Sequence, residues 1–186
     1  MATAIAAQKG WPIVIADVGC AFLRGLTFKE LSELQGTPVR VVCMELPADS
    51  AALLRTIPGF ETFSLSVEVL ELDKPGFGLK DAPHAWGLRF DKHMHERQGI
   101  RPTHADNKLY LGHERGNGGL DLTAAVASHV DDLKMTAPRP KLEKMLALLT
   151  EDFGELKVKW HTFECCGEQV EQNQLRCRLQ LTRTTT

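Results

Sequence analysis

Three aspartates stand at the ends of two apolar runs and could together hold divalent metal ions. Asp131 and Asp132 follow the run 122–130, and Asp17 closes the shorter run 11–16. In an in-line phosphoryl displacement, two divalent metals about 3.5 to 4 Å apart stabilise both the attacking and the leaving oxygen. Mg²⁺ prefers carboxylate oxygens and keeps water and substrate phosphates in its remaining positions. The three aspartates therefore suit two-metal phosphoryl transfer with Mg²⁺, or with Mn²⁺ in its place.

Both apolar runs have the composition of buried strands. The longer run is short enough for a strand and follows a pair of glycines, so we expect it to deliver its two aspartates to one strand tip. Successive strand residues point to opposite faces. Asp131 and Asp132 can thus approach one metal only where the strand is already turning, and Asp131 is the expected stronger ligand. We expect Asp17 to lie beside them at the end of a neighbouring strand.

Further motifs accompany these aspartates in a fixed order along the chain. They are Gly10-Trp11, Asp17-Val18-x-x-Ala21-Phe22-Leu23-x-Gly25, Val42-Cys-Met-Glu-Leu-Pro47, Lys74-Pro-Gly-Phe-Gly-Leu-Lys-Asp-Ala-Pro-His-Ala-Trp86, Phe90-Asp91-Lys92, Ala105-Asp106, His129-Val-Asp-Asp132 and Phe153-Gly-Glu-Leu-Lys157. This order resembles the reverse transcriptase of copia-type long-terminal-repeat retrotransposons. The resemblance covers most of the chain up to Lys157, and the conjunction of motifs is far more specific than any one of them.

The resemblance implies roles for the residues around the metal site. Asp17 and Asp131 would bind the metals, with Asp132 beside them and the Val18 carbonyl as a further ligand. The backbone amides that follow would face the incoming triphosphate; these belong to Cys20 and Ala21.

The resemblance also implies contacts to the sugar and the template. Phe22 would lie under the sugar and favour deoxynucleotides by clashing with a ribose 2′-hydroxyl; the alternative is an ordinary core phenylalanine. The segment 79–83 would approach the template and the nascent base pair, with Lys80 as the expected phosphate contact. Asp81 stands where many relatives have a glutamine.

Other features depart from the family pattern. His129 replaces the usual aromatic residue before Val-Asp-Asp. It could contact a nucleic-acid backbone, or it could be a satisfied histidine beside two acids, with a pH-sensitive charge. The family also has basic fingers strands upstream of Trp11 and a thumb and ribonuclease H region downstream, so we expect fingers and thumb to be incomplete in these 186 residues.

Composition predicts a globular chain that binds nucleic acid weakly on its own. The chain has 22 Lys and Arg against 24 Asp and Glu, a formal charge of -2, whereas a self-sufficient nucleic-acid binder usually has a basic face. Its length and its 43% hydrophobic residues suit one domain or slightly more. No secretory signal or apolar span of transmembrane length is evident. We therefore expect a soluble intracellular protein, and the resemblance implies cytoplasmic virus-like particles or the nucleus as its compartment.

The five cysteines are irregularly placed, which favours free thiols over a disulfide framework. Cys20 and Cys43 lie in apolar runs and are expected in the core. Zinc is disfavoured because the candidate ligands lack the paired spacing of structural zinc sites; these are His161, Cys165, Cys166 and Cys177.

Hydrophobic periodicity indicates the elements that position these residues. We expect strands near 11–17, 39–46, 107–112, 122–131 and 156–165. One helix follows Asp81 as its cap, with an apolar stripe at Trp86, Phe90 and Met94. Its basic side chains could form a solvated face or a rail for the template strand; these are Arg89, Lys92 and Arg97. A second helix runs from Pro140 to Gly154, and a short one from 50 to 57, inside a segment 47–70 whose role the sequence does not indicate.

These elements predict an α+β fold, with an antiparallel palm-like sheet bearing the carboxylates at one edge and helices on the opposite face. A doubly wound parallel fold would show similar interleaving, and the resemblance decides between them. We expect a palm-like domain at 1–165 and a partly disordered C-terminal extension at 166–186.

The predicted function is RNA-directed DNA polymerisation by a fragment of a retrotransposon polyprotein. Its partners would be an RNA or DNA template-primer, deoxynucleoside triphosphates, and the integrase and ribonuclease H regions of the polyprotein, with no membrane. One alternative is a catalytically inactive relic or interaction module. A small metal-dependent phosphohydrolase is another, which we disfavour because no additional His or Glu cluster is evident near the aspartates.

Overall fold

The computed structural model describes residues 1–116, 118–165, 167–173 and 178–183. The helices are α1 (Ala2–Lys9), the 3₁₀ turn η1 (Ala21–Arg24), α2 (Phe28–Gln35), α3 (Ala48–Leu54), α4 (Ala82–Glu96) and α5 (Arg139–Phe153). The strands are β1 (Ile13–Val18), β2 (Cys43–Met44), β3 (Leu70–Glu71), β4 (Arg101–Pro102), β5 (Leu109–Gly116), β6 (Gly119–His129), β7 (Asp132–Thr136), β8 (Leu156–Trp160), β9 (Thr162–Cys165), β10 (Glu168–Asn173) and β11 (Arg178–Arg183).

The main sheet is antiparallel throughout. In the described part of the chain it has six strands in the order β4-β5-β6-β7-β1-β8, and every neighbouring pair is antiparallel. Together with the helices, this sheet confirms the α+β class and makes the doubly wound parallel alternative wrong. A smaller sheet has the order β11-β10-β9, and β2 pairs with β3.

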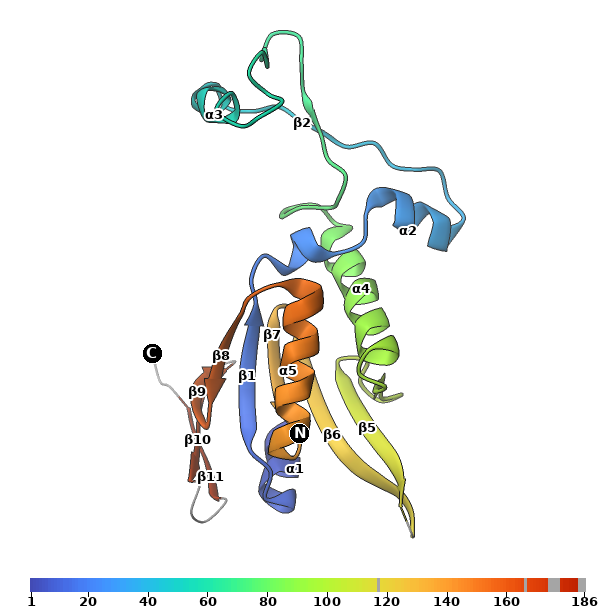
Figure 1. Cartoon of the computed structure of the whole chain (residues 1–186), viewed down its shortest axis with the longest axis vertical. Coiled ribbons are helices and arrows are strands. Elements are labelled where there is room, and N and C mark those ends of the chain that lie inside the picture. The colour runs from blue at the N-terminus through green and yellow to red at the C-terminus, as the bar shows by residue number, and fades with distance from the viewer. Residues whose placement is uncertain (117, 166, 174–177, 184–186) are drawn as a thin grey trace.

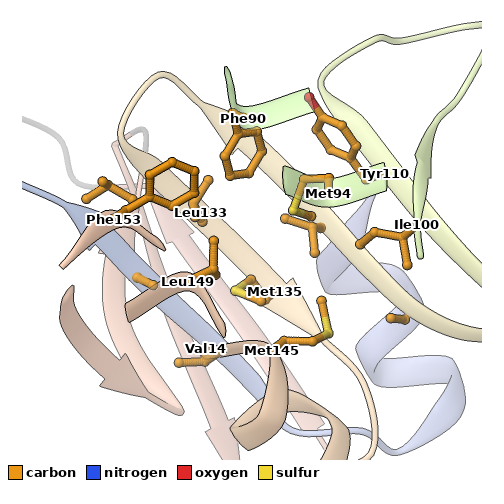
Figure 2. Close-up of a cluster of buried hydrophobic side chains, with 14 of the residues drawn as sticks. Val14, Phe90, Met94, Ile100, Tyr110, Leu133, Met135, Met145, Leu149 and Phe153 are labelled. Carbon is orange, nitrogen blue, oxygen red and sulfur yellow. The ribbon is translucent and has the colours of Figure 1, made fainter. Parts of the chain in front are cut away.

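Helices α4 and α5 cover one face of the main sheet. On β1, the alternate residues Val14, Ala16 and Val18 belong to the same buried cluster as Leu133 and Met135 of β7. Figure 2 shows this cluster, in which side chains of both helices close over the strands; those labelled from the helices are Phe90, Met94, Met145, Leu149 and Phe153. The predicted apolar stripe of α4 is therefore confirmed as core, and α5 buries a stripe of its own beside it.

The opposite face of the sheet is covered in part by α1 and the smaller sheet. Ile13 and Ile15 of β1 point to this face and form a second buried cluster with Ala6, Phe163 and Val170. Figure 1 places α1 at the start of β1, and Asp17 lies near the other end of that strand. Helix α1 and the smaller sheet thus cover the part of this face that lies near the start of β1.

Several predicted elements are wrong in their bounds. Of the strand expected at 39–46, only Cys43–Met44 is a strand, because the run is exposed and pairs only with the two-residue strand β3; Val39 and Val41 are more than half exposed. The strand expected at 156–165 is divided at His161, whose φ of 64° breaks the extended backbone, so β8 and β9 join different sheets. The strand expected at 122–131 ends at His129, and β7 was not predicted.

The start of α4 and the cysteines also differ from expectation. Asp81 precedes α4, but its carboxylate pairs with Arg40 instead of capping the helix. Cys20 and Cys43 are exposed, so their predicted place in the core is wrong, because Cys20 lies in the turn that follows β1 and Cys43 lies in the short, exposed strand β2. Of the zinc candidates, Cys166 and Cys177 lie outside the described residues.

The C-terminal extension contains two strands. β10 and β11 pair with each other, and β10 pairs with β9. The positions 166, 174–177 and 184–186 lie outside the described residues. Within the part of the chain that the structure covers, no helix has the length and apolar character needed to cross a membrane.

Candidate functional site

The structure brings the predicted aspartates together at the ends of two neighbouring strands. In the pairing of β1 with β7, Asp17 lies directly opposite Asp132. Residues opposite each other in an antiparallel pair have Cβ atoms about 4.5 to 5.5 Å apart. The amide of Val18 also donates a hydrogen bond to the carbonyl of Asp131, at 3.0 Å. The expectation that the strand ends lie side by side is confirmed, although β7 and not β6 is the neighbour of β1.

Asp131 lies in a tight turn between β6 and β7. His129 pairs with Asp132, so Val130 and Asp131 form a two-residue connection. Val130 has φ = 56°, a conformation that is strained for a β-branched residue. The indole Nε1–H of Trp86, on α4, donates to the Val130 carbonyl at 2.7 Å. This bond from the helix layer holds the turn that carries Asp131.

Asp17 and Asp132 point to the face of the sheet that is opposite to α4 and α5. Val18 and Leu133, their neighbours along each strand, are fully buried in the cluster under those helices. Because side chains alternate along a strand, the two carboxylates project from the other face. Both residues are partly exposed, and Asp131 is exposed. The three carboxylates are therefore reachable from solvent.

The cluster of carboxylates is electrostatically unfavourable without a cation. Partial burial raises the pKa of Asp132, and the negative charges of Asp131 and Asp17 raise it further. His129 and Lys134 oppose this rise. A divalent cation bound between the carboxylates would remove this repulsion. The cluster therefore has the electrostatic character of a metal site.

Two rows of side chains cross the strands on this face. The first row is Lys157, Asp17, Asp132 and His129, in the order β8-β1-β7-β6. The second row, two residues along each strand, is Lys159, Ile15, Lys134 and Ala127. Lys157 therefore lies beside the acids in the first row, and Lys134 and Lys159 lie in the adjacent second row. Such a pattern can hold phosphates next to a metal site.

Lys157 is the nearest cation to Asp17. Its Nζ lies 3.5 Å from Oδ2 of Asp17, and its side chain is 82% exposed, so this is a weak surface pair. Among the described residues, no three His, Cys, Asp or Glu side chains converge closely enough to hold a metal ion. Asp17 and Asp132 lie opposite each other, and Asp131 is adjacent. A change of side-chain rotamer could bring these carboxylates closer to one another.

The residues that follow β1 form a turn at the protein surface. Cys20 is exposed and has φ = 54°, and Ala21 opens η1. The guanidinium of Arg24 donates through Nε to the carbonyl of Gly19, at 3.0 Å, and so fixes this turn. The turn continues directly from the strand that carries Asp17, so its amides lie on the same strand end as the carboxylates. Val18, the last residue of β1, is buried toward the helices.

Phe22 has both a packing role and a place in a cavity. It is partly buried against the main core, and its ring meets that of Phe77 edge to face at 5.3 Å. It also lines a cavity of about 90 Å³ together with Trp86, Lys108 and Val130. Phe22 therefore lies close to the turn that carries the acids.

The structure does not place Lys80 and Asp81 in the carboxylate cluster. Lys80 is exposed just before α4. Asp81 pairs with Arg40, and both line a separate cavity of about 180 Å³ beside α2.

Sequence reasoning missed three contributors to the site: the Trp86 bond to the turn, the lysines of β8, and Lys134. The lysines could have been found, because Leu156-Lys-Val-Lys-Trp160 and Asp132-Leu-Lys-Met-Thr136 alternate as half-buried strands do. The Trp86 bond joins residues 44 positions apart and leaves no local signal.

Comparison with known proteins adds no relative: no family model, no curated protein and no solved structure matches the chain.

Proposed function

We propose that the chain is the palm portion of an RNA-directed DNA polymerase, similar to that of copia-type retrotransposons. The single observation that carries the proposal is the placement of Asp17, Asp131 and Asp132. Asp17 and Asp132 lie opposite each other on two paired strands, on the face away from the helices, and Asp131 lies in the turn beside them. The motif order along the chain supports the same function, because the motifs surround these three positions.

In this function Asp17 and Asp131 hold two Mg²⁺ ions, with Asp132 beside them, and Mn²⁺ can replace Mg²⁺. When bound, such metals stabilise the attacking primer 3′-oxygen and the leaving pyrophosphate. The turn at Cys20 and Ala21 offers backbone N–H groups to the triphosphate. Phosphoryl transfer needs little covalent chemistry from the protein, so positioning and charge are the contributions required of these residues.

The remaining side chains select and hold the substrates. Phe22 lies under the sugar of the incoming nucleotide and excludes a ribose 2′-hydroxyl. Lys134, Lys157 and Lys159 lie next to the acids and attract strand phosphates. Lys80 and Asp81 approach the template through the start of α4.

The partners of this palm-like unit are an RNA or DNA template-primer and deoxynucleoside triphosphates. With a formal charge of -2, the chain needs additional basic surface to grip a duplex. Fingers and thumb segments, and the integrase and ribonuclease H regions of a polyprotein, would supply that surface. The compartment would be a cytoplasmic virus-like particle or the nucleus.

A second candidate is a relic that keeps the fold without the chemistry. The observation that favours it is the absence, in the described part of the chain, of three converging metal-ligating side chains. The repulsion among the three carboxylates lowers the stability of the fold. A protein without catalytic activity would have no functional reason to keep them together. We therefore rank the polymerase first.

Primer extension tests the proposal. A longer chain that supplies fingers and thumb should extend a DNA primer on an RNA template, and Asp131→Asn should abolish extension while the fold persists. Asp121→Asn is the matched control, because Asp121 is exposed near the other end of β6. If the Asp131 variant extends primers as well as the Asp121 variant, the assignment of the carboxylates is wrong.

A further inference from the structure

A cavity of about 310 Å³ lies where η1, the start of α2, α4 and the end of α5 meet. Three cations line it, Arg24, Lys74 and Arg89, together with two carboxylates, Glu30 and Asp152. Its walls include residues of both helices that back the main sheet. The cavity is therefore separate from the carboxylates of β1 and β7, which project from the other face.

Both carboxylates of the cavity are already engaged. Oδ2 of Asp152 accepts a hydrogen bond from Nδ1 of the buried His93 at 2.6 Å and lies 3.4 Å from Nε of Arg97. Oε2 of Glu30 accepts from the amide of Thr27 at 2.7 Å and from its hydroxyl at 2.9 Å, as part of the capping box of α2. These hydrogen bonds hold both carboxylates in place, and the three cations outnumber them in the lining.

The three cations have no carboxylate partner at ion-pair distance within the described residues. Lys74 and Arg89 are half-buried, where an unpaired charge is costly. Their positive field contributes to lowering the pKa of Glu30, after the hydrogen bonds from Thr27. The cavity is therefore an electropositive hollow with hydrogen-bond donors on several walls.

Arg24 is held in place toward this cavity. Its Nε donates to the Gly19 carbonyl, and its guanidinium lies against Gly154, where a Cβ would come within 3.1 Å of both Nη atoms. The missing side chain at Gly154 makes room for the guanidinium. A guanidinium fixed in this way loses little entropy when it binds an oxyanion, and its planar fork matches phosphate oxygens.

We propose that this cavity binds phosphate groups. Two guanidinium groups and one ammonium group converge on it, the combination that recognises phosphate. None of its described lining residues is aromatic, so it offers no ring on which a base could stack. Its volume is near the lower end of small-molecule sites, which suits phosphate groups better than a whole nucleotide. The proposal does not depend on the metal site, because none of the three aspartates lines the cavity and Asp17 and Asp132 project from the other face of the sheet.

The test is a titration of the purified chain with tripolyphosphate at low salt, with a chelator present to remove divalent metals. Arg89→Gln and Lys74→Gln should each weaken binding about tenfold, the effect of losing one charge-assisted hydrogen bond. Lys92→Gln is the matched control, since Lys92 is an exposed cation of α4 that does not line the cavity. Arg89→Lys, which keeps the charge and loses the fork, should give an intermediate affinity.

A second arm identifies the source of the phosphate. If a single-stranded oligo(dT) competes with tripolyphosphate and loses affinity in Arg89→Gln, the cavity takes the sugar-phosphate backbone of a nucleic acid. If oligo(dT) does not compete, the cavity takes a free polyphosphate. Tripolyphosphate affinity that is the same in wild type, Arg89→Gln and Lys74→Gln, or equally reduced in Lys92→Gln, overturns the proposal. Asp17→Asn should leave this affinity unchanged, so failure here and failure of the metal site are distinguishable.

Discussion

Removing one charge from the carboxylate cluster should stabilise the metal-free protein. Asp132 lies opposite Asp17 and next to Asp131, so Asp132→Asn removes two repulsive interactions, together with the smaller attractions to His129 and Lys134. Unit charges about 5 Å apart repel by about 0.8 kcal/mol in water and by about 3 kcal/mol at an effective dielectric constant of 20. Because Asp132 is partly exposed, we take the lower part of this range. We expect the free energy of unfolding to rise by about 1 kcal/mol at pH 7, and the Tm by about 2 to 4 °C.

The stabilisation should depend on pH with a definite sign. The pKa of Asp132 is raised in the folded protein, so the folded state holds its proton more tightly than the unfolded state. Below the ordinary pKa of aspartate both states are protonated and the variant has no advantage. As pH rises through the raised pKa, the wild type loses stability relative to Asp132→Asn, and the difference is complete at neutral pH.

Thermal and urea unfolding in the presence of a chelator, at several pH values from 4.5 to 7.5, measures this difference. Asp121→Asn controls for the general effect of removing an aspartate, because Asp121 is exposed on the same sheet. A lower Tm for Asp132→Asn than for wild type at pH 7 would refute the reasoning. So would a gain that does not grow with pH.

Three other residues give predictions of different kinds. Burial lowers the pKa of His93, against the opposing effect of Asp152, so the contribution of His93 to stability should be complete above pH 6.5 and should fall as the pH decreases, by at most about 1.4 kcal/mol per pH unit. In urea unfolding, His93→Gln should flatten this dependence of stability on pH, and an unaltered dependence would assign it to other groups. Gly25→Ala should destabilise the fold by about 1 to 3 kcal/mol, because its Cβ would come 2.9 Å from the backbone nitrogen of Trp86; an unchanged urea midpoint would contradict this. Phe22→Val, in a chain with fingers and thumb, should raise the ratio of ribonucleotide to deoxynucleotide incorporation, whereas an unchanged ratio with lowered stability would assign Phe22 to the core.

The long helices and the positions of the acids were predictable from the sequence. The stripe of Trp86, Phe90 and Met94 recurs at helical spacing, and such a stripe has few alternatives to burial against a sheet. Asp17 and the Asp131-Asp132 pair follow apolar runs, and they meet because β6 and β1 run in the same direction on either side of β7. Local pattern was sufficient in these cases because each element buries one continuous apolar face.

The turn and the peripheral strands were not predictable in the same way. A strand that ends in two acids looks the same whether the chain leaves the sheet or reverses, so β7 was missed. The β-branched residues Val39 and Val41 favour a strand by propensity, but they are exposed, and propensity without burial did not produce one. The bond from Trp86 to the Val130 carbonyl depends on tertiary packing alone.

The proposed polymerase function depends most directly on divalent metal binding by the three carboxylates. Titration of the chain with Mn²⁺, followed by electron paramagnetic resonance, counts the bound ions and gives their affinity. We predict saturable binding that Mg²⁺ competes for, that Asp17→Asn and Asp131→Asn each abolish, and that Asp121→Asn leaves intact. Equal Mn²⁺ binding by wild type and by Asp17→Asn and Asp131→Asn would contradict the account.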